Sequence, residues 1–125
     1  MKLTKIQYGI IIAILATAVA HLLAAFDKVL FPDHIDPLFL LNGLGFLGLL
    51  GAYFLPIPFF QKRHELVRKA LIGFSILTIA AWVFIWVIQY VIINGTPFFS
   101  HDSIYGVPAK IAEVALIFLL RNDKP

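Results

Sequence analysis

The chain has 125 residues, of which 61% are hydrophobic and 14% are charged, with a net charge of +3. Soluble domains average about 45–50% apolar and about 25% charged residues, so this composition predicts a membrane protein and excludes an ordinary soluble domain. The sequence has no cysteine, which excludes disulfides, thiolate metal sites and cysteine nucleophiles. The basic residues lie in short loops between apolar runs, so the positive charge does not indicate nucleic-acid binding.

The first apolar run covers residues 8–26 and follows Lys2 and Lys5. A helix rises about 1.5 Å per residue and the hydrocarbon core is about 30 Å thick, so this run is long enough to cross a bilayer. Small residues near Ala20 also make it similar to a signal peptide. We expect it to be retained as the first span, with His21 in its second half.

The second run covers residues 37–55, opens with a proline and is followed by Pro56 and Pro58. Small residues recur along it and are expected to form a packing face. They are Gly45, Gly48, Gly51 and Ala52. Such a face lets two helices approach closely in lipid. We favour packing against a neighbouring helix of the same chain, and the alternative is the seam of a dimer.

The third run covers residues 70–94 and follows a basic loop at residues 61–69. Its aromatic stripe of Trp82, Trp86 and Tyr90 is more typical of packing or lipid contact than of a cofactor site. The basic side chains of the loop are expected to contact anionic lipid headgroups. They are Lys62, Arg63, Arg68 and Lys69.

The fourth run covers residues 104–120 and contains Lys110 and Glu113. A charged side chain well inside a bilayer costs about 2.5–3.5 kcal/mol on insertion scales, so neither charge can face lipid. Residues separated by three positions lie on the same face of a helix. We therefore expect Lys110 to pair with Glu113.

Each of the four runs is continuously apolar, without the alternation of a membrane strand. The predicted fold class is therefore all-α: one domain over residues 1–125, an up-down bundle of four transmembrane helices in the cytoplasmic membrane of a prokaryote. With four spans, almost all basic residues fall on one side, and Lys28 is the exception. The positive-inside rule then places both termini in the cytoplasm.

One strongly polar side chain per span is expected at a similar depth, in the half of the bilayer away from the cytoplasm. They are His21, Asn42, Gln89 and Glu113, with Lys110 slightly nearer the surface. One interpretation is a buried hydrogen-bond network that holds the helices together. The other is an outward-facing polar cavity of a small transporter or channel, because ionisable residues inside a membrane are candidates for function.

Other kinds of site are less well supported. Haem could use His21 as an axial ligand, but a second histidine would have to come from a dimer. A divalent metal could use side chains of the two outer loops. They are His34, Asp36, His101 and Asp102. No phosphate-binding loop or nucleophile motif is present, so we expect no catalytic residues, no cofactor and no enzyme activity.

Three segments together resemble a family of small, uncharacterised four-span membrane proteins of prokaryotes, with members in haloarchaea. They are residues 20–22 around His21, residues 37–48, and residues 107–114 with Lys110 and Glu113. The resemblance covers most of the chain and implies the four-span fold. It also implies that a lysine is usual at Lys110, whereas an amide can replace Glu113. No activity is established for that family.

We therefore expect a non-enzymatic accessory or structural subunit that contacts the bilayer and either other membrane subunits or further copies of itself. The alternative is a small transporter or channel whose cavity is lined by the polar side chains of the four spans.

Overall fold

The computed structural model describes residues 2–101 and 103–123. Within these residues, four helical segments are long and apolar enough to cross a membrane. They are Lys5–Ala25, Pro37–Phe54, His64–Ile93 and Ser103–Asn122. The described part of the chain contains no strand, so the all-helical fold class predicted from the sequence is confirmed.

The first two long helices begin at side-chain caps. Helix α1, Lys5–Ala25, is preceded by Thr4, whose hydroxyl accepts from the Gln7 backbone N–H, while the Gln7 side chain accepts from the Thr4 N–H. This reciprocal cap lets α1 begin three residues before the apolar run. Helix α2, Pro37–Phe54, is capped by Asp36, whose carboxylate accepts from the Phe39 N–H at 2.9 Å.

The predicted basic loop at residues 61–69 is largely helical. The short helix α3, Pro58–Gln61, is followed by α4, His64–Trp82, which begins six residues before the apolar run. Polarity does not prevent helix formation here, because Glu65 and Arg68 form an i, i+3 ion pair in the first turns of α4. Hydropathy located the apolar part of this helix, but it did not locate its first turn.

Helix α4 continues directly into η1, Val83–Ile93, a π-helix that is wider than an α-helix. The Asn94 N–H donates to the Gln89 carbonyl at 3.2 Å, five residues back. The last helix is α5, Ser103–Asn122, which contains Pro108 in its second turn.

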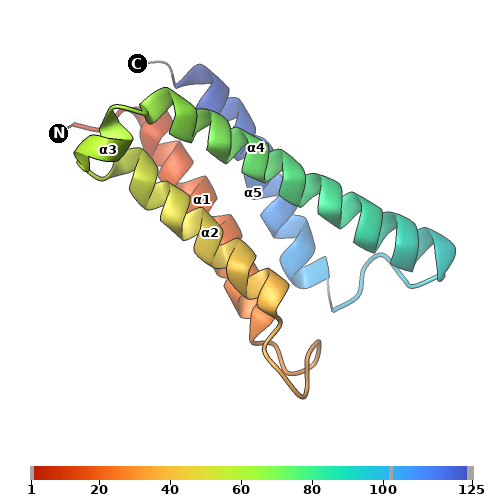
Figure 1. Ribbon diagram of the computed structural model, residues 1–125. Coiled ribbons are helices and arrows are strands. Elements are labelled where there is room, and N and C mark those ends of the chain that lie inside the picture. The colour runs from red at the N-terminus through yellow and green to blue at the C-terminus, as the bar shows by residue number, and fades with distance from the viewer. Residues whose placement is uncertain (1, 102, 124–125) are drawn as a thin grey trace.

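Helix α1 lies at the centre of the bundle, where it packs against both α2 and α5, while α4 packs against α5 and α2 (Figure 1). Among the described helices, the backbone of η1 lies close only to α4, from which it continues, although the Trp86 side chain of η1 is buried. The hydrophobic core therefore lies in the part of the bundle nearer the termini. Its fully buried large side chains are Ile10, Ile14, Phe46, Leu71, Leu116 and Leu120.

The predicted small-residue face of α2 is only partly used inside the chain. A Cβ atom on Gly45 would lie 2.8 Å from the Phe74 ring, but none of the described atoms lies within 4 Å of a Cβ on Gly48. The Gly51 position meets only Leu55, which follows α2, while Ala52 packs at the edge of the core. A tight contact between α1 and α2 occurs instead at Gly43, a position outside the predicted face, where a Cβ atom would lie 2.7 Å from Leu22 Cγ.

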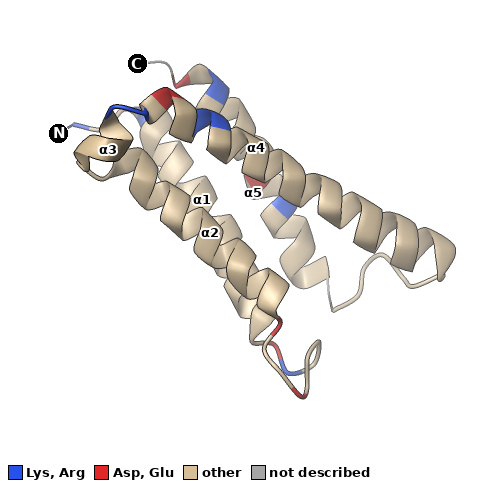
Figure 2. Cartoon of the chain, in the orientation of Figure 1, with Lys and Arg blue, Asp and Glu red and all other residues tan. Residues whose placement is uncertain are grey.

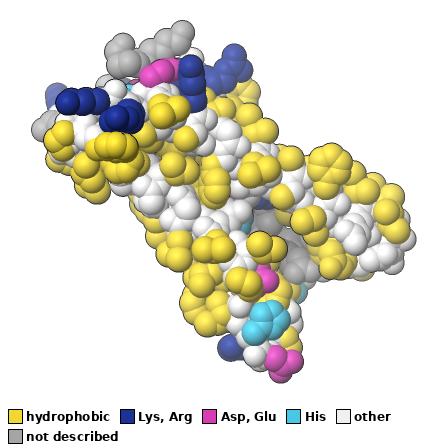
Figure 3. Space-filling model, in the orientation of Figure 1, with side chains coloured by type: hydrophobic (Ala, Val, Ile, Leu, Met, Phe, Trp, Pro, Cys, Tyr) yellow, Lys and Arg dark blue, Asp and Glu magenta, His cyan; other side chains and the backbone are white. Residues whose placement is uncertain are grey.

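The two ends of the bundle differ in charge. Both termini, α3 and nearly all Lys and Arg residues lie at one end, here called the termini end (Figure 2). The connections at residues 26–36 and 94–101 lie at the other, here called the loop end (Figure 1). Hydrophobic side chains cover much of the visible surface between these ends (Figure 3).

Candidate functional site

A cluster of ionisable and hydroxyl side chains is buried between α1 and α5. The Lys110 ammonium donates to Glu113 Oε1 at 2.7 Å, which confirms the pairing expected from their spacing. Glu113 is fully buried and Lys110 is 8% exposed. Burying an isolated carboxylate would be costly, so the adjacent ammonium is what makes this position tolerable.

Helix α1 supplies the other half of this buried cluster, through Thr17 and His21. The Thr17 hydroxyl donates to Glu113 Oε2 at 2.5 Å. His21 lies one turn further along the same face, 5% exposed, with Nε2 at 3.9 Å from the same Glu113 oxygen. The two carboxylate oxygens of Glu113 therefore face different partners: Lys110 on its own helix and Thr17 on α1.

The hydrogen bonds of His21 determine where its proton lies. Its Nδ1 lies 2.8 Å from the Thr17 carbonyl oxygen, and a carbonyl can only accept, so Nδ1 donates. In the neutral ring Nε2 is then an acceptor, and it faces the carboxylate of Glu113. At 3.9 Å the pair is too far apart for a hydrogen bond, and it becomes an ion pair only if His21 takes up a second proton.

Two members of the predicted polar layer lie apart from this cluster. Asn42 donates to the Thr78 hydroxyl at 3.3 Å, which links α2 to α4. Gln89 lies on the exposed side of η1 and makes no side-chain hydrogen bond within the described residues. The prediction of a single layer is therefore corrected for Gln89, because η1 separates from the bundle and carries that side chain away from α1 and α5.

A second polar cluster lies at the loop end. Asp27, just beyond α1, accepts from the Tyr105 hydroxyl, and its Oδ2 lies 2.8 Å from His101 Nε2. It also accepts from the Val29 and Leu30 backbone N–H groups. The Tyr105 hydroxyl, followed by His101, holds the pKa of Asp27 well below its ordinary value. Asp27 thus ties the end of α1 to the start of α5.

The candidate metal ligands of the outer loops have other partners. Asp36 caps α2, the His34 ring packs against Phe31 with centroids 5.5 Å apart, and His101 contacts Asp27. Among the described residues, no group of three or more potential ligands is assembled. Asp102 lies outside the described residues. The nitrogen of His21 that a haem iron would use also has a neighbour within the chain. His21 is buried, and its Nε2 faces the carboxylate of Glu113.

A third group of polar side chains lies at the termini end. The Tyr53 hydroxyl donates to Asp123, and the rings of Tyr53 and His64 pack with centroids 4.4 Å apart. Arg68 donates to the Leu120 carbonyl at 2.8 Å as well as to Glu65. Arg68 therefore stabilises the end of α5, a role different from the lipid contact expected from the sequence.

The other basic residues predicted to contact lipid remain on the surface. Lys62, Arg63 and Lys69 are exposed, and the Arg63 guanidinium lies 4.0 Å from the centre of the Phe59 ring. They can reach anionic headgroups without breaking an ion pair recorded within the described residues.

The profile of one family matches residues 2–119, nearly the whole chain. The chain belongs to this family, DUF7475, a family of unknown function. The match fits the resemblance to an uncharacterised family. No curated protein and no solved structure matches the chain.

The DUF7475 match contains the whole buried cluster and both partners of Asp27, whereas Asp123 lies beyond it. Sequence reasoning missed Thr17, Tyr105 and Tyr53 as polar partners. For Thr17 a signal was present, because it precedes His21 by four residues and so lies on the same helix face. Chemically, the buried cluster can hold α1 against α5 and can bind one further proton at His21 or Glu113.

Proposed function

We propose that this chain is a non-enzymatic subunit of a membrane assembly, formed with other membrane proteins or with further copies of itself. In this proposal the four long helices cross the cytoplasmic membrane of a prokaryote, with both termini in the cytoplasm. The gathering of Lys and Arg at the termini end supports this orientation through the positive-inside rule (Figure 2).

The burial of the cluster and the pairing of its charges support a structural role for it. Thr17 and Glu113 are fully buried, and each charge of the cluster has a partner within the chain. A cavity that conducted ions or substrate would expose these groups to water. The cluster is better suited to joining the first helix to the last.

The observation that carries the proposal is the position of Gln89. It lies exposed on η1, whose backbone lies close only to α4 among the described helices. Exposed apolar side chains of η1 can simply face lipid, but a primary amide in lipid has unsatisfied donors and acceptors. A partner helix from another molecule would satisfy this amide.

The test is the size of the assembly in native membranes, extracted in a mild detergent and separated by native electrophoresis. We expect the wild-type chain to migrate in a complex larger than one chain and Gln89→Leu to reduce that complex. The matched control is Ile93→Leu, which changes an exposed residue of the same helix without removing an amide. Migration of the wild-type protein as a single chain would overturn the proposal.

The second candidate is a small transporter or channel that uses His21 and Glu113. The orientation of the neutral His21 ring favours it, since Nε2 faces a carboxylate with room for one added proton. Flux assays in vesicles with Glu113→Gln separate the two candidates. Lost flux with an unchanged unfolding temperature supports transport, and the absence of flux in the wild-type protein supports the structural role.

A further inference from the structure

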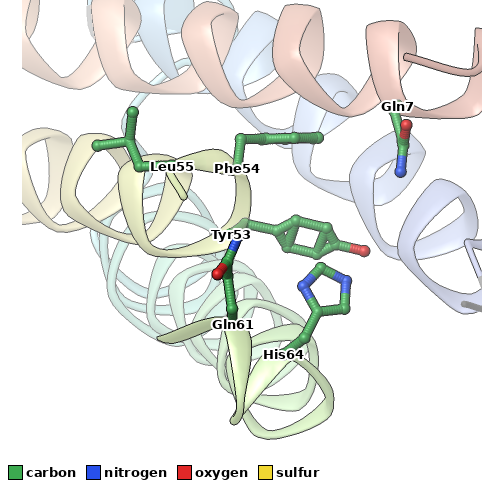
Figure 4. Close-up of a pocket in the computed structure, with 6 residues that line it drawn as sticks. All are labelled: Gln7, Tyr53, Phe54, Leu55, Gln61 and His64. Carbon is green, nitrogen blue, oxygen red and sulfur yellow. The ribbon is translucent and has the colours of Figure 1, made fainter. Parts of the chain in front are cut away.

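A pocket opens at the termini end, between the start of α1, the end of α2 and the start of α4 (Figure 4). Its volume is about 220 Å³, whereas about 10–15 Å³ is enough to hold one water molecule. It is therefore large enough for a headgroup-sized molecule. The residues that line it are Gln7, Tyr53, Phe54, Leu55, Gln61 and His64.

The polar side chains of this pocket include hydrogen-bond donors that have no acceptor within the described residues. The Gln7 side chain uses its oxygen to accept from the Thr4 N–H, and within the described part of the chain its NH₂ group has no hydrogen-bond acceptor. Neither Gln61 nor His64 makes a side-chain hydrogen bond within residues 2–101 and 103–123. Amide and imidazole N–H groups that line a pocket suit an oxygen-rich ligand. Figure 4 shows Gln61 and His64 near each other and Gln7 on the other side of the Tyr53 ring.

The charges around the pocket favour an anion. Lys62 and Arg63 are exposed between the two lining residues Gln61 and His64. Of the nearby acidic side chains, Glu65 pairs with Arg68, whereas Asp123 accepts from the uncharged Tyr53 hydroxyl. Figure 3 shows basic side chains gathered on the surface at this end of the molecule.

The remaining wall of the pocket is apolar. Phe54 and Leu55 line it where α2 ends, and Phe59 is exposed nearby on α3. In the proposed orientation this level is the boundary between the cytoplasmic headgroups and the acyl chains. A polar half and an apolar half at that level match an amphiphile, whereas a free anion would use only the polar half.

We propose that this pocket binds the phosphate of an anionic phospholipid, held by Gln61 and His64, while the NH₂ group of Gln7 faces another oxygen of the headgroup. Lys62 and Arg63 attract the negative headgroup, and the glycerol end of the lipid lies against Phe54 and Leu55. The inference concerns a defined site, which differs from diffuse attraction between basic residues and a charged membrane.

The experiment measures lipid retention by native mass spectrometry on the full chain in neutral detergent. The probes are phosphatidylglycerol, phosphatidylcholine and inorganic phosphate. We expect phosphatidylglycerol to be retained and phosphatidylcholine to be lost. Excess inorganic phosphate should not displace the lipid, because it cannot use the apolar wall. Equal retention of both lipids, or displacement by phosphate alone, overturns the proposal.

Two variants test the pocket itself. Gln61→Leu removes an amide, and His64→Phe removes the ring nitrogens while keeping a ring against Tyr53. Each should lower phosphatidylglycerol retention about tenfold, as loss of a charge-assisted hydrogen bond does. Asn94→Leu also replaces an exposed amide, at the loop end and outside the pocket, and should retain lipid normally. Wild-type retention by both pocket variants overturns the proposal, and circular dichroism shows whether each variant is folded.

Discussion

Thr17 on the first helix donates its hydroxyl to Glu113 on the last, across 96 positions of sequence. Together with the Lys110–Glu113 ion pair, this hydrogen bond makes the contact between α1 and α5 polar as well as apolar. Because Glu113 is fully buried, the strength of the contact depends on keeping both carboxylate oxygens satisfied.

Replacing Thr17 with valine keeps the shape of the side chain but removes the donor to Glu113. We expect Thr17→Val to lower the free energy of unfolding by about 1–2 kcal/mol, since the lost bond is to a buried charged group. Thr17→Ser keeps the hydroxyl and should recover most of this loss. Denaturant titration in detergent measures both, and equal stability of the two variants would contradict the role of the hydroxyl.

Removing Lys110 should be more damaging, because it leaves a buried carboxylate without its counter-charge. We expect Lys110→Met to cost about 3 kcal/mol. The double variant Lys110→Met with Glu113→Met removes both charges and should be more stable than the single variant. The control Ile111→Met changes an exposed neighbour on α5. A double variant less stable than Lys110→Met would show that the pair does not act as a unit.

The glycines of α2 offer a matched pair of substitutions. A Cβ at Gly43 would lie 2.7 Å from Leu22 Cγ and 3.1 Å from the Ala18 carbonyl oxygen, while Gly48 faces open space. We expect Gly43→Ala to destabilise the chain by about 1–3 kcal/mol through overpacking. Gly48→Ala should be neutral or slightly stabilising, because alanine favours helix. Thermal unfolding followed by circular dichroism distinguishes them, and the reverse order would be inconsistent with the close α1–α2 contact.

The lowered pKa of Asp27 makes the loop end sensitive to acid. A carboxyl whose pKa is lower in the folded state stabilises the fold at neutral pH, and this stabilisation is lost as the pH falls through the folded value. The loss should therefore begin near the ordinary pKa of 3.8 and continue below it. Asp27→Asn should be less stable than the wild type at pH 7 and should lose less stability on acidification.

The measurement is the unfolding temperature between pH 7 and pH 2 in detergent, which includes the range below 3.8 where the loss is expected. Tyr105→Phe removes the largest cause of the lowered pKa and should reduce the pH dependence in the same direction. An acid transition of unchanged size in both variants would mean that other carboxyls control it.

The four long helices could be predicted from the sequence because each contains a continuous apolar run long enough to cross a membrane. The predicted ends of the helices were less accurate. Helix α4 begins at His64 because its first turns contain helix-forming charged residues and an i, i+3 ion pair, and a hydropathy pattern does not detect these features. The short helix α3 was not predicted, because two prolines follow α2 and such prolines usually indicate the end of a helix.

The ion pair was predictable from spacing alone, because Lys110 and Glu113 lie on one helix. Contacts between helices were not predictable from the sequence, because the position of a residue along a helix does not determine the direction in which its side chain points. Gln89 was placed at the depth of His21 and Glu113, yet the divergence of η1 turns it away from both. Thr17 was overlooked, because a hydroxyl in an apolar helix usually bonds to its own backbone.

The central place of α1, in contact with both α2 and α5, has a consequence for biosynthesis. The ribosome completes α1 first and α5 last, so in the proposed membrane arrangement Thr17 and His21 enter the bilayer long before Glu113 has been translated. Until then, the earliest helix must shelter its polar groups against the translocation machinery, a chaperone or water. A nascent chain arrested before residue 113 should therefore be a substrate for quality-control proteolysis, and release of the full-length chain should end that vulnerability.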